Sequence, residues 1–429
     1  MKILILSKNH PYKRSGTVAK GILDVLKSIE GNDVKLIVGV RDRYSDNDIV
    51  SIDNYLIDLK NQLQGKWEKL LKKVGILRNN KVITNPDYHV LDYDQTSTIH
   101  STNKFLKKAG FIPDAVIVLF MPKFLSFKNL YEINQITKAP IYIYPMDMAP
   151  MTGGCHYAWD CESYVNKCGN CPAMYSDDEN DQSRKNWEFK KKYIDKANIK
   201  VIYGTRYLYR QLKKSSIFKE KEMHYIPLSI DEELFKPGSM RDARKYHNLP
   251  NGTYIVLCGA NNINHKRKGI NELLEALKII KAMNPSLKIH LAIVGRSTSD
   301  FTTSLPYDYS MLGRLSFEEL VRAYQAADVF VSPSTQDSGP MMVSQAMMCG
   351  TPVVAYEMGV AVDLVITGKT GYRAKLQDSN DLAKGIMTIL SLDRAGYEAI
   401  SENCRDLCVK TRSKEKYRER WNIILNNNV

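Results

Sequence analysis

The sequence predicts an α/β protein with two parallel-sheet domains in tandem. Short apolar β runs alternate with helical stretches along most of the chain, which is typical of parallel strands joined by helices. The pattern of strand, polar loop and helix opens the chain and begins again at Tyr254–Gly259. A length of 429 residues also favours two or three domains over a single core.

The first half begins with the apolar strand Lys2–Ser7, a polar loop containing Gly16, and an amphipathic helix that runs through Leu26. Further strands in this half are expected at Val34–Val38, Ala115–Leu119 and Ile141–Tyr144. In the second half, a loop and the helix Ile270–Ala282 follow the strand Tyr254–Gly259. Further strands there are expected at Ile289–Gly295, Asp328–Ser332 and Pro352–Tyr356.

The stretch between the halves, Ile226–Gly238, contains two prolines and no continuous periodicity, as an interdomain linker would. We therefore expect an N-terminal domain at residues 1–230, a C-terminal domain at 231–412, and a helix at 413–429 that packs back on the N-terminal domain. Ligands of parallel sheets bind at the carboxyl ends of the strands, so two such domains imply a cleft between them. One large sheet, or two domains with unrelated functions, would produce a similar pattern.

The charge is basic and regional. The chain has 61 Lys and Arg against 47 Asp and Glu, a net charge of +14, which favours an anionic partner such as a nucleotide, a membrane surface or a nucleic acid. Residues 60–81 carry a net +6 and residues 184–224 a net +9, so the rest of the chain is close to neutral. No module for stacking or reading bases is present, which argues against nucleic acid.

The opening apolar run is too short for a signal peptide, and no stretch has the ~18 apolar residues of a membrane span. We therefore expect a cytoplasmic protein, with peripheral association at the inner face of the cell membrane. In that compartment the eight cysteines stay reduced.

Residues 328–356, DVFVSPSTQDSGPMMVSQAMMCGTPVVAY, resemble the donor-site signature of retaining glycosyltransferases of family 4, which have the GT-B fold. Lys268-Gly269 before a helix and the segment Gly313–Leu320 match further motifs of that family, and residues 145–172 resemble enzymes of bacterial exopolysaccharide and O-antigen assembly. The resemblance implies two Rossmann-like domains that face each other across a cleft. It also implies transfer of a sugar from a nucleotide-sugar donor to a saccharide acceptor.

The resemblance places three catalytic residues in the second half: Arg267, Lys268 and Asp337. Cations at a helix N-terminus can stabilise the negative charge that grows on a departing diphosphate. Family members usually carry an arginine soon after the first strand of this domain, but Gly259–Asn264 contains no cation, and we expect Arg267 to supply that charge. Without the resemblance, Arg267 and Lys268 would be interpreted as a solvated basic turn.

Family members usually carry two glutamates where this chain has Asp337 and Gln345, and the resemblance implies contacts from these positions to the donor sugar and the ribose. Taken alone, the segment is a loop before a buried, methionine-rich helix. The resemblance implies a larger set of donor-binding residues: Gly16, Gly259, Asn261, Arg296, Gly313, Ser338, Gly339, Pro340, Met341, Met342 and Gln345.

No pair of carboxylates has readable glycosidase spacing. We therefore expect front-face displacement, in which the departing phosphate takes the acceptor's proton, with no cofactor required for catalysis. On the acceptor side, the candidates are Asp147 and Thr152. Many relatives have His-Asp where this chain has Met146-Asp147, so a role of that histidine does not transfer. The alternative for Asp147 is a capping residue in a loop after a strand.

Four cysteines, Cys155, Cys161, Cys168 and Cys171, follow one another at C-x5-C-x6-C-x2-C within the Cys-rich loop 153–172. Four thiolates suffice for a tetrahedral structural zinc site. Packed thiols and a disulfide are the alternatives.

Residues 60–81 combine apolar and basic residues at helical spacing, which suits an anionic membrane surface and favours a lipid-linked saccharide acceptor. An amphipathic helix packed on the first sheet is the alternative. A nucleotide-sugar epimerase of the same architecture is the competing function, and the oligomeric state is not predicted by any of these features.

Overall fold

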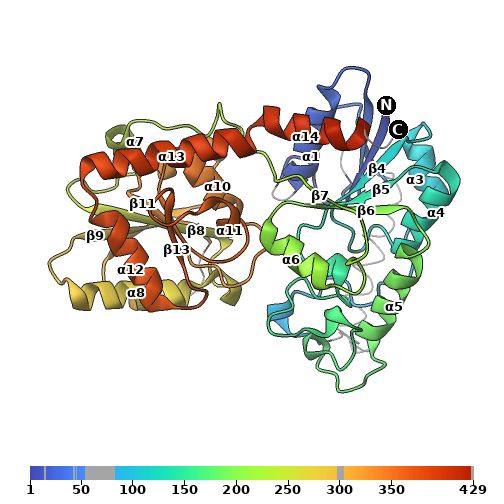
Figure 1. Ribbon diagram of the computed structural model, residues 1–429, viewed down its shortest axis with the longest axis horizontal. Helices are drawn as coiled ribbons and strands as arrows, with labels where there is room; N and C mark the ends of the chain where they lie inside the picture. Colours follow the sequence, from blue (N-terminus) through green and yellow to red (C-terminus); the bar gives the residue numbers. More distant parts are fainter. Residues whose placement is uncertain (14–15, 42–43, 45, 54–82, 297–303, 427–429) are drawn as a thin grey trace, which may run out of the picture. The chain divides into compact units, whose positions relative to one another are not determined.

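The computed structural model describes residues 1–13, 16–41, 44, 46–53, 83–296 and 304–426. The chain divides into two compact units (Figure 1). Unit 1 comprises Met1–Tyr203, Gln211–Tyr225 and Arg420–Val429, and unit 2 comprises Gly204–Arg210 and Ile226–Glu419. The amphipathic segment predicted at residues 60–81 lies outside the described residues. No helix in the described part of the chain is long and apolar enough to cross a membrane.

Unit 1 contains a seven-stranded sheet in the order β3-β2-β1-β4-β5-β6-β7, and all neighbouring strands are parallel. The strands are β1 (Lys2–Ser7), β2 (Asp33–Val38), β3 (Ile49–Ser51), β4 (Ala115–Val118), β5 (Ile141–Ile143), β6 (Ile199–Tyr203) and β7 (Met223–Tyr225). The four residues of β4 and the three of β5 are fully apolar or aromatic and buried, as expected for strands covered on both faces.

The helices of unit 1 include α1 (Gly16–Lys27), α3 (Thr102–Ala109), α4 (Phe127–Thr137) and α5 (Gln182–Ile194), while α6 (Arg206–Lys214) begins in unit 2 and ends in unit 1. Short 3₁₀ turns interrupt the long connection from β5 to α5: η2 (Ala149–Met151), η3 (Ser163–Val165) and η4 (Pro172–Met174). An earlier turn, η1 (Pro86–Tyr88), precedes α3.

Unit 2 contains a six-stranded sheet in the order β10-β9-β8-β11-β12-β13, again with parallel neighbours throughout. The strands are β8 (Tyr254–Asn262), β9 (Ile289–Arg296), β10 (Asp308–Gly313), β11 (Val329–Ser332), β12 (Val353–Tyr356) and β13 (Gly371–Ala374). The helices are α7 (Met240–Tyr246), α8 (Ile270–Met283), α9 (Phe317–Ala326), α10 (Met341–Met348), α11 (Ala361–Leu364), α12 (Ser379–Leu390) and α13 (Arg394–Arg412).

The strand predictions are confirmed in both halves, and so is the prediction of two parallel-sheet α/β units. Each predicted strand overlaps an observed one, and the predicted helix Ile270–Ala282 differs from α8 by one residue. A run of apolar residues bounded by polar loops is a strong local signal, because burial on both faces of a parallel sheet demands it.

The predicted linker, Ile226–Gly238, contains no helix or strand, and Arg405 of α13 binds two of its carbonyl oxygens. Arg405 donates from Nη1 to the carbonyl oxygens of Phe235 at 2.6 Å and Met348 at 2.9 Å, and from Nη2 to that of Glu232 at 3.0 Å. The planar guanidinium suits this use, since its five donors point in fixed directions.

The last helix, α14 (Lys414–Asn426), ends among residues of unit 1. Trp421 is fully buried, and its ring lies edge-on to that of Tyr144, with 6.4 Å between centroids. Ile423, two residues on, is 58% exposed. The helix is therefore attached to unit 1 by one apolar side of its final turns.

This attachment can be tested by truncating Trp421. Trp421→Ala removes a large buried ring and leaves a cavity, so we expect unit 1 to lose about 3–5 kcal/mol of stability against urea, as measured by circular dichroism. Ile423→Ala, on the exposed side of the same helix, should change stability by less than about 0.5 kcal/mol. Equal effects of the two substitutions would contradict the packing described.

Candidate functional site

The carboxyl edge of the unit 2 sheet gathers the predicted donor-site residues. The chain builds the sheet outward in one direction from β8 to β10 and in the other from β11 to β13, so the strand order reverses between β8 and β11. Ligands of such sheets bind outside the carboxyl ends of the strands at this reversal. The loops that follow β8 and β11 carry Arg267, Lys268 and Asp337.

These three residues form a buried ion cluster. The Oδ2 atom of Asp337 accepts a hydrogen bond from Arg267 Nη1 at 2.8 Å and another from Lys268 Nζ, and the three side chains are only 15–17% exposed. Burial alone would raise the pKa of Asp337, but the charges of Lys268 and Arg267 hold it at about 2. Burial lowers the pKa of Lys268, while the Asp337 carboxylate opposes that change. The cluster thus holds two cations and one anion.

A tight turn before α8 positions the two cations. The turn η5 (Lys266–Lys268) ends at Gly269, which has φ +67°, and α8 begins at the next residue. A Cβ atom on Gly269 would lie 1.7 Å from the carbonyl oxygen of Pro333, so glycine is required by both conformation and space. Thr335 N donates to Arg267 O at 2.8 Å and joins this turn to the loop after β11.

The predicted donor-binding residues between Asp337 and α10 surround the cluster. Asp337 Oδ1 accepts from the backbone N–H of Gly339 at 3.2 Å, and the carbonyl of Ser338 accepts from Thr205 Oγ1 at 2.9 Å. Pro340 caps α10, and its first turn contains Met341 and Met342. Sequence reasoning missed Thr205, because it lies 133 residues before Ser338.

The ends of β8, β9 and β10 supply the other predicted donor residues of unit 2. Gly259 lies in β8 beside Met342, whose Cε would be 3.0 Å from an added Cβ, and Arg296 and Gly313 end β9 and β10. Asn261 Oδ1 accepts from Arg314 Nη2 at 3.0 Å. Arg314 is an additional cation at this edge that we did not predict, although its position directly after Gly313 is a usable signal.

Gln345 is more deeply buried than we expect for a residue that binds a ribose. It is 7% exposed, and its carbonyl Oε1 accepts a hydrogen bond from the hydroxyl of Tyr324 at 3.1 Å. The predicted contact to a ribose can use the amide nitrogen of Gln345 or the remaining lone pair of Oε1.

In unit 1 the strand order reverses between β1 and β4. Gly16, predicted to approach the donor diphosphate, is the first residue of α1, and an added Cβ would lie 1.9 Å from the carbonyl oxygen of His10. The packing of α1 against the loop after β1 therefore accounts for glycine at this position without any ligand.

A pocket in unit 1 lies at the carboxyl ends of β4 and β5. It combines three aromatic rings with charged and amide groups, and its lining includes Asp92, Gln95, Phe120, Lys123, Phe124, Phe127, Met146, Asp147, His156 and Lys190. Of the two predicted acceptor-side residues, Asp147 lines this pocket, while Thr152 is fully buried and lines a neighbouring small pocket. The histidine that sequence reasoning missed, His156, lies with its Nδ1 at 2.7 Å from Asp147 Oδ2.

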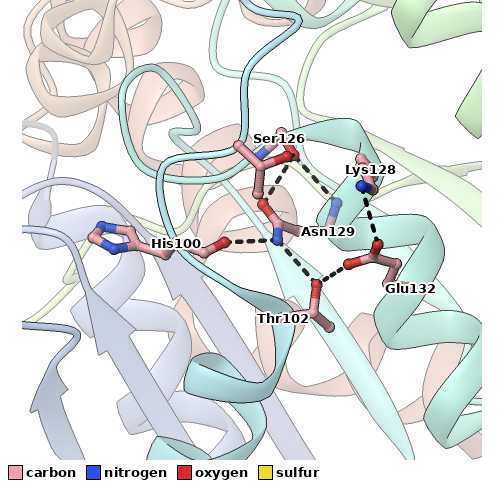
Figure 2. A network of polar contacts seen from close by, with 7 residues as sticks. His100, Thr102, Ser126, Lys128, Asn129 and Glu132 are labelled. Atoms are coloured by element: carbon pink, nitrogen blue, oxygen red, sulfur yellow. Dashed lines mark hydrogen bonds and ion pairs between the residues drawn. The ribbon is translucent and has the colours of Figure 1, made fainter.

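The wall of the pocket is held by polar contacts at the start of α4 (Figure 2). Ser126 and Asn129 form a reciprocal cap, and Asn129 Nδ2 donates to His100 O and to Thr102 Oγ1, each at 3.0 Å. Asn129 is fully buried, so its hydrogen bonds fix the loop that precedes α4 against the segment leading into α3.

Lys190, from α5, is buried beneath the same pocket and is 1% exposed. Its Nζ donates to the carbonyl oxygens of Ala149 at 2.7 Å and Thr152 at 2.8 Å. Burial lowers the pKa of Lys190 to about 8, and nearby acidic groups only partly oppose this change.

The four clustered cysteines line one small pocket in unit 1. They are free thiols, and burial raises the pKa of Cys168 to about 12, as it also raises that of Cys155. Among the described residues, no group of three or more His, Cys, Asp or Glu is arranged to hold a metal ion. The zinc site stays a prediction, since the arrangement brings the cysteines together without supplying its geometry.

With this geometry in view, the chain can be compared with known proteins. Residues 240–407 match the family model of glycosyl transferases group 1. The match contains all three members of the ion cluster. A protein of Corynebacterium glutamicum, described as a GDP-mannose-dependent monoacylated alpha-(1-6)-phosphatidylinositol monomannoside mannosyltransferase, is 25% identical over 203 residues. That alignment covers 44% of this chain and 52% of the relative, so the chain spans about half the length of this curated relative.

Solved structures show the fold over the whole chain. Sucrose-phosphate synthase from Thermosynechococcus elongatus superposes with a TM-score of 0.67 at 19% identity, covering 99% of this chain and 98% of that one. HepE from Anabaena, solved in complex with UDP, superposes with a TM-score of 0.64 at 15% identity and covers all of both chains. The predicted GT-B fold is confirmed.

Gly269→Ala should destabilise unit 2 beyond the cost of its backbone conformation. A positive φ costs a non-glycine residue about 1–2 kcal/mol, and the added Cβ would also displace the Pro333 carbonyl. Gly368→Ala is the matched control, because Gly368 has φ +77° and open space where the Cβ would lie. Thermal unfolding should show a clearly larger loss for Gly269→Ala, and equal losses would contradict the close approach.

Lys190 should make stability rise with pH. Between pH 8 and 10.5 the unfolded chain keeps the Lys190 proton that the folded chain has lost, so unfolding takes up a proton and becomes less favourable as pH rises. The difference between about 8 and 10.5 corresponds to about 3 kcal/mol. Urea unfolding at several pH values should show that the stability of the wild type rises relative to that of Lys190→Met over this interval. A stability difference between the two proteins that does not change with pH would contradict this prediction.

Proposed function

We propose that this protein is a retaining family 4 glycosyltransferase that moves a sugar from a nucleotide-sugar donor to a saccharide acceptor. The observation that carries the proposal is the ion cluster of Arg267, Lys268 and Asp337. It lies at the strand-order reversal of a region that matches group 1 glycosyl transferases. Buried cations at such an edge are suited to a diphosphate.

The proposed chemistry uses few protein groups. The bond between the sugar C1 and the diphosphate oxygen breaks, and Lys268 and Arg267 stabilise the charge that develops on the departing diphosphate. The N-terminus of α8, directly after Lys268, adds a partial positive charge. The acceptor hydroxyl attacks C1 from the same face, and its proton goes to the departing phosphate. Asp337 contacts the donor sugar.

Two nucleotides, UDP and GDP, are supported for the donor. HepE, which shares the fold, was solved with UDP, and the mannosyltransferase relative is described as GDP-mannose-dependent. We propose a nucleoside diphosphate sugar as the donor class, with the base to be found by direct comparison.

We propose a lipid-linked saccharide as the acceptor, in the synthesis of a bacterial surface polysaccharide at the inner face of the cell membrane. The basic amphipathic sequence at residues 60–81 supports this proposal, as does the Corynebacterium relative, whose name includes a monoacylated phosphatidylinositol monomannoside.

A comparison of UDP-, GDP- and dTDP-sugars by thermal unfolding tests the donor class. A donor at ~100 times its dissociation constant should add ~2.7 kcal/mol of stability, and the slow release of nucleoside diphosphate from that donor should be measurable. Lys268→Met and Arg267→Ala should each slow that release by about 10²-fold or more, because each removes a cation from the leaving group.

Lys278→Met serves as the control, since Lys278 is half-exposed on the same helix α8 and pairs with Glu275. Unchanged kinetics in both cluster variants, with their folding verified by circular dichroism, would sink the proposed role of these cations. Stabilisation by none of the nucleotide-sugars would do the same for the donor class.

A further inference from the structure

The pocket of unit 1 contains a buried imidazole with an unused polar atom. His156 is 4% exposed, and its Nε2 has no hydrogen-bond partner among the residues that the structure describes. A buried polar atom left without a partner costs about 1–3 kcal/mol, so its retention calls for a reason. The other polar atoms of the residue are all engaged.

The backbone of His156 is held on both sides. Its N–H donates to Tyr88 O at 2.9 Å, and its carbonyl accepts from Met148 N at 3.1 Å. On the side chain, Nδ1 lies 2.7 Å from Asp147 Oδ2, while Asp147 Oδ1 accepts from Ala149 N at 2.9 Å. Asp147 is thus both the capping residue that we had considered and the partner of an imidazole.

This arrangement leaves Nε2 as the ring nitrogen that can meet a ligand. A carboxylate oxygen only accepts hydrogen bonds, so Nδ1 donates to Asp147 and Nε2 is left for another group. A hydroxyl group can both donate and accept a hydrogen bond, so it is suited to pair with Nε2. Because the ring is fixed through Nδ1 and through the backbone, little freedom is lost when such a group binds.

The rest of the lining is suited to a sugar ring. Phe120, Phe124 and Phe127 supply apolar surface, while Asp92 and Gln95 supply polar groups on the same pocket. Mixed lining of this kind, with a few fixed polar atoms, is typical of pockets for small polar ligands. Met146 lines the pocket together with His156.

We propose that His156, oriented by Asp147, hydrogen-bonds through Nε2 to a hydroxyl of the acceptor saccharide, whose ring occupies the unit 1 pocket. The proposal rests on the proposed glycosyl transfer for the identity of its ligand. Asp147 acts as a positioning residue, because it touches the imidazole and not the sugar. Lys190 supports the same wall through the carbonyls of Ala149 and Thr152.

Two substitutions of His156 test the roles of its two ring nitrogens separately. The amide of asparagine reaches about as far as Nδ1, so His156→Asn keeps a donor for Asp147 and removes the atom at Nε2. The longer His156→Gln restores a polar atom near the Nε2 position. The probes are methyl α- and β-glycosides of glucose, galactose and mannose, titrated calorimetrically into the full chain up to 100 mM.

We expect wild type to bind at least one glycoside, His156→Asn to bind it about tenfold more weakly, and His156→Gln to recover part of the loss. Tenfold corresponds to the ~1.4 kcal/mol of one hydrogen bond. Asp147→Asn should change the ¹⁵N signals of the His156 ring from the Nδ1–H tautomer. His247→Gln is the control, since His247 lies in unit 2 and bonds a backbone carbonyl.

The proposal is overturned if wild type binds none of the glycosides, if His156→Asn binds as well as wild type, or if Asp147→Asn leaves the tautomer unchanged. UDP and GDP titrated into the same variants distinguish this outcome from failure of the proposed function. If glycoside binding is lost while nucleotide binding is intact, the result bears only on the proposed role of His156. If the wild type binds no nucleotide, the result contradicts the proposed role of the ion cluster of unit 2.

Discussion

The hydrogen bonding of parallel strands determines where every functional side chain of this protein lies. Parallel pairing requires a crossover between neighbouring strands, so all carboxyl ends in a sheet share one edge and all helices start near it. In unit 2 this constraint brings the loops after β8 and β11 together, although 70 residues separate Arg267 from Asp337. In unit 1 the same constraint opens a pocket at the ends of β4 and β5.

In the proposed reaction, the ion cluster of unit 2 holds two cations in a largely buried place before a diphosphate binds. Two buried cations without an anion would be costly, and Asp337 compensates for part of that cost. The strongly lowered pKa of Asp337 reflects this coupling. A bound phosphate would provide the same compensation, so in the proposed reaction the carboxylate becomes available to the donor sugar as the cations turn to the leaving group.

Unit 1 contains a buried cation in a different arrangement. Among the residues that the structure describes, no carboxylate forms an ion pair with the buried Lys190, and its lowered pKa reflects the unfavourable burial. Its ammonium group donates hydrogen bonds to two carbonyls of the loop between Asp147 and His156, and it thereby fixes that loop. A rigid wall with one unsatisfied nitrogen is what a binding site requires and a stability-optimised core would avoid.

The sequence by itself determined the central strands of both sheets and the two-unit architecture, because local apolar runs encode them, and its resemblance to a known family singled out the three residues of the ion cluster. Only the tertiary structure decided which side chains meet. His156 contacts Asp147 across a loop that contains the turn η2, Lys190 binds the carbonyl of Ala149 from 41 residues away, and Thr205 contacts Ser338 from the other half of the chain. Such contacts leave no periodic trace, since hydrogen bonds between loops depend on the positions of strands distant in sequence and not on the spacing of neighbouring residues.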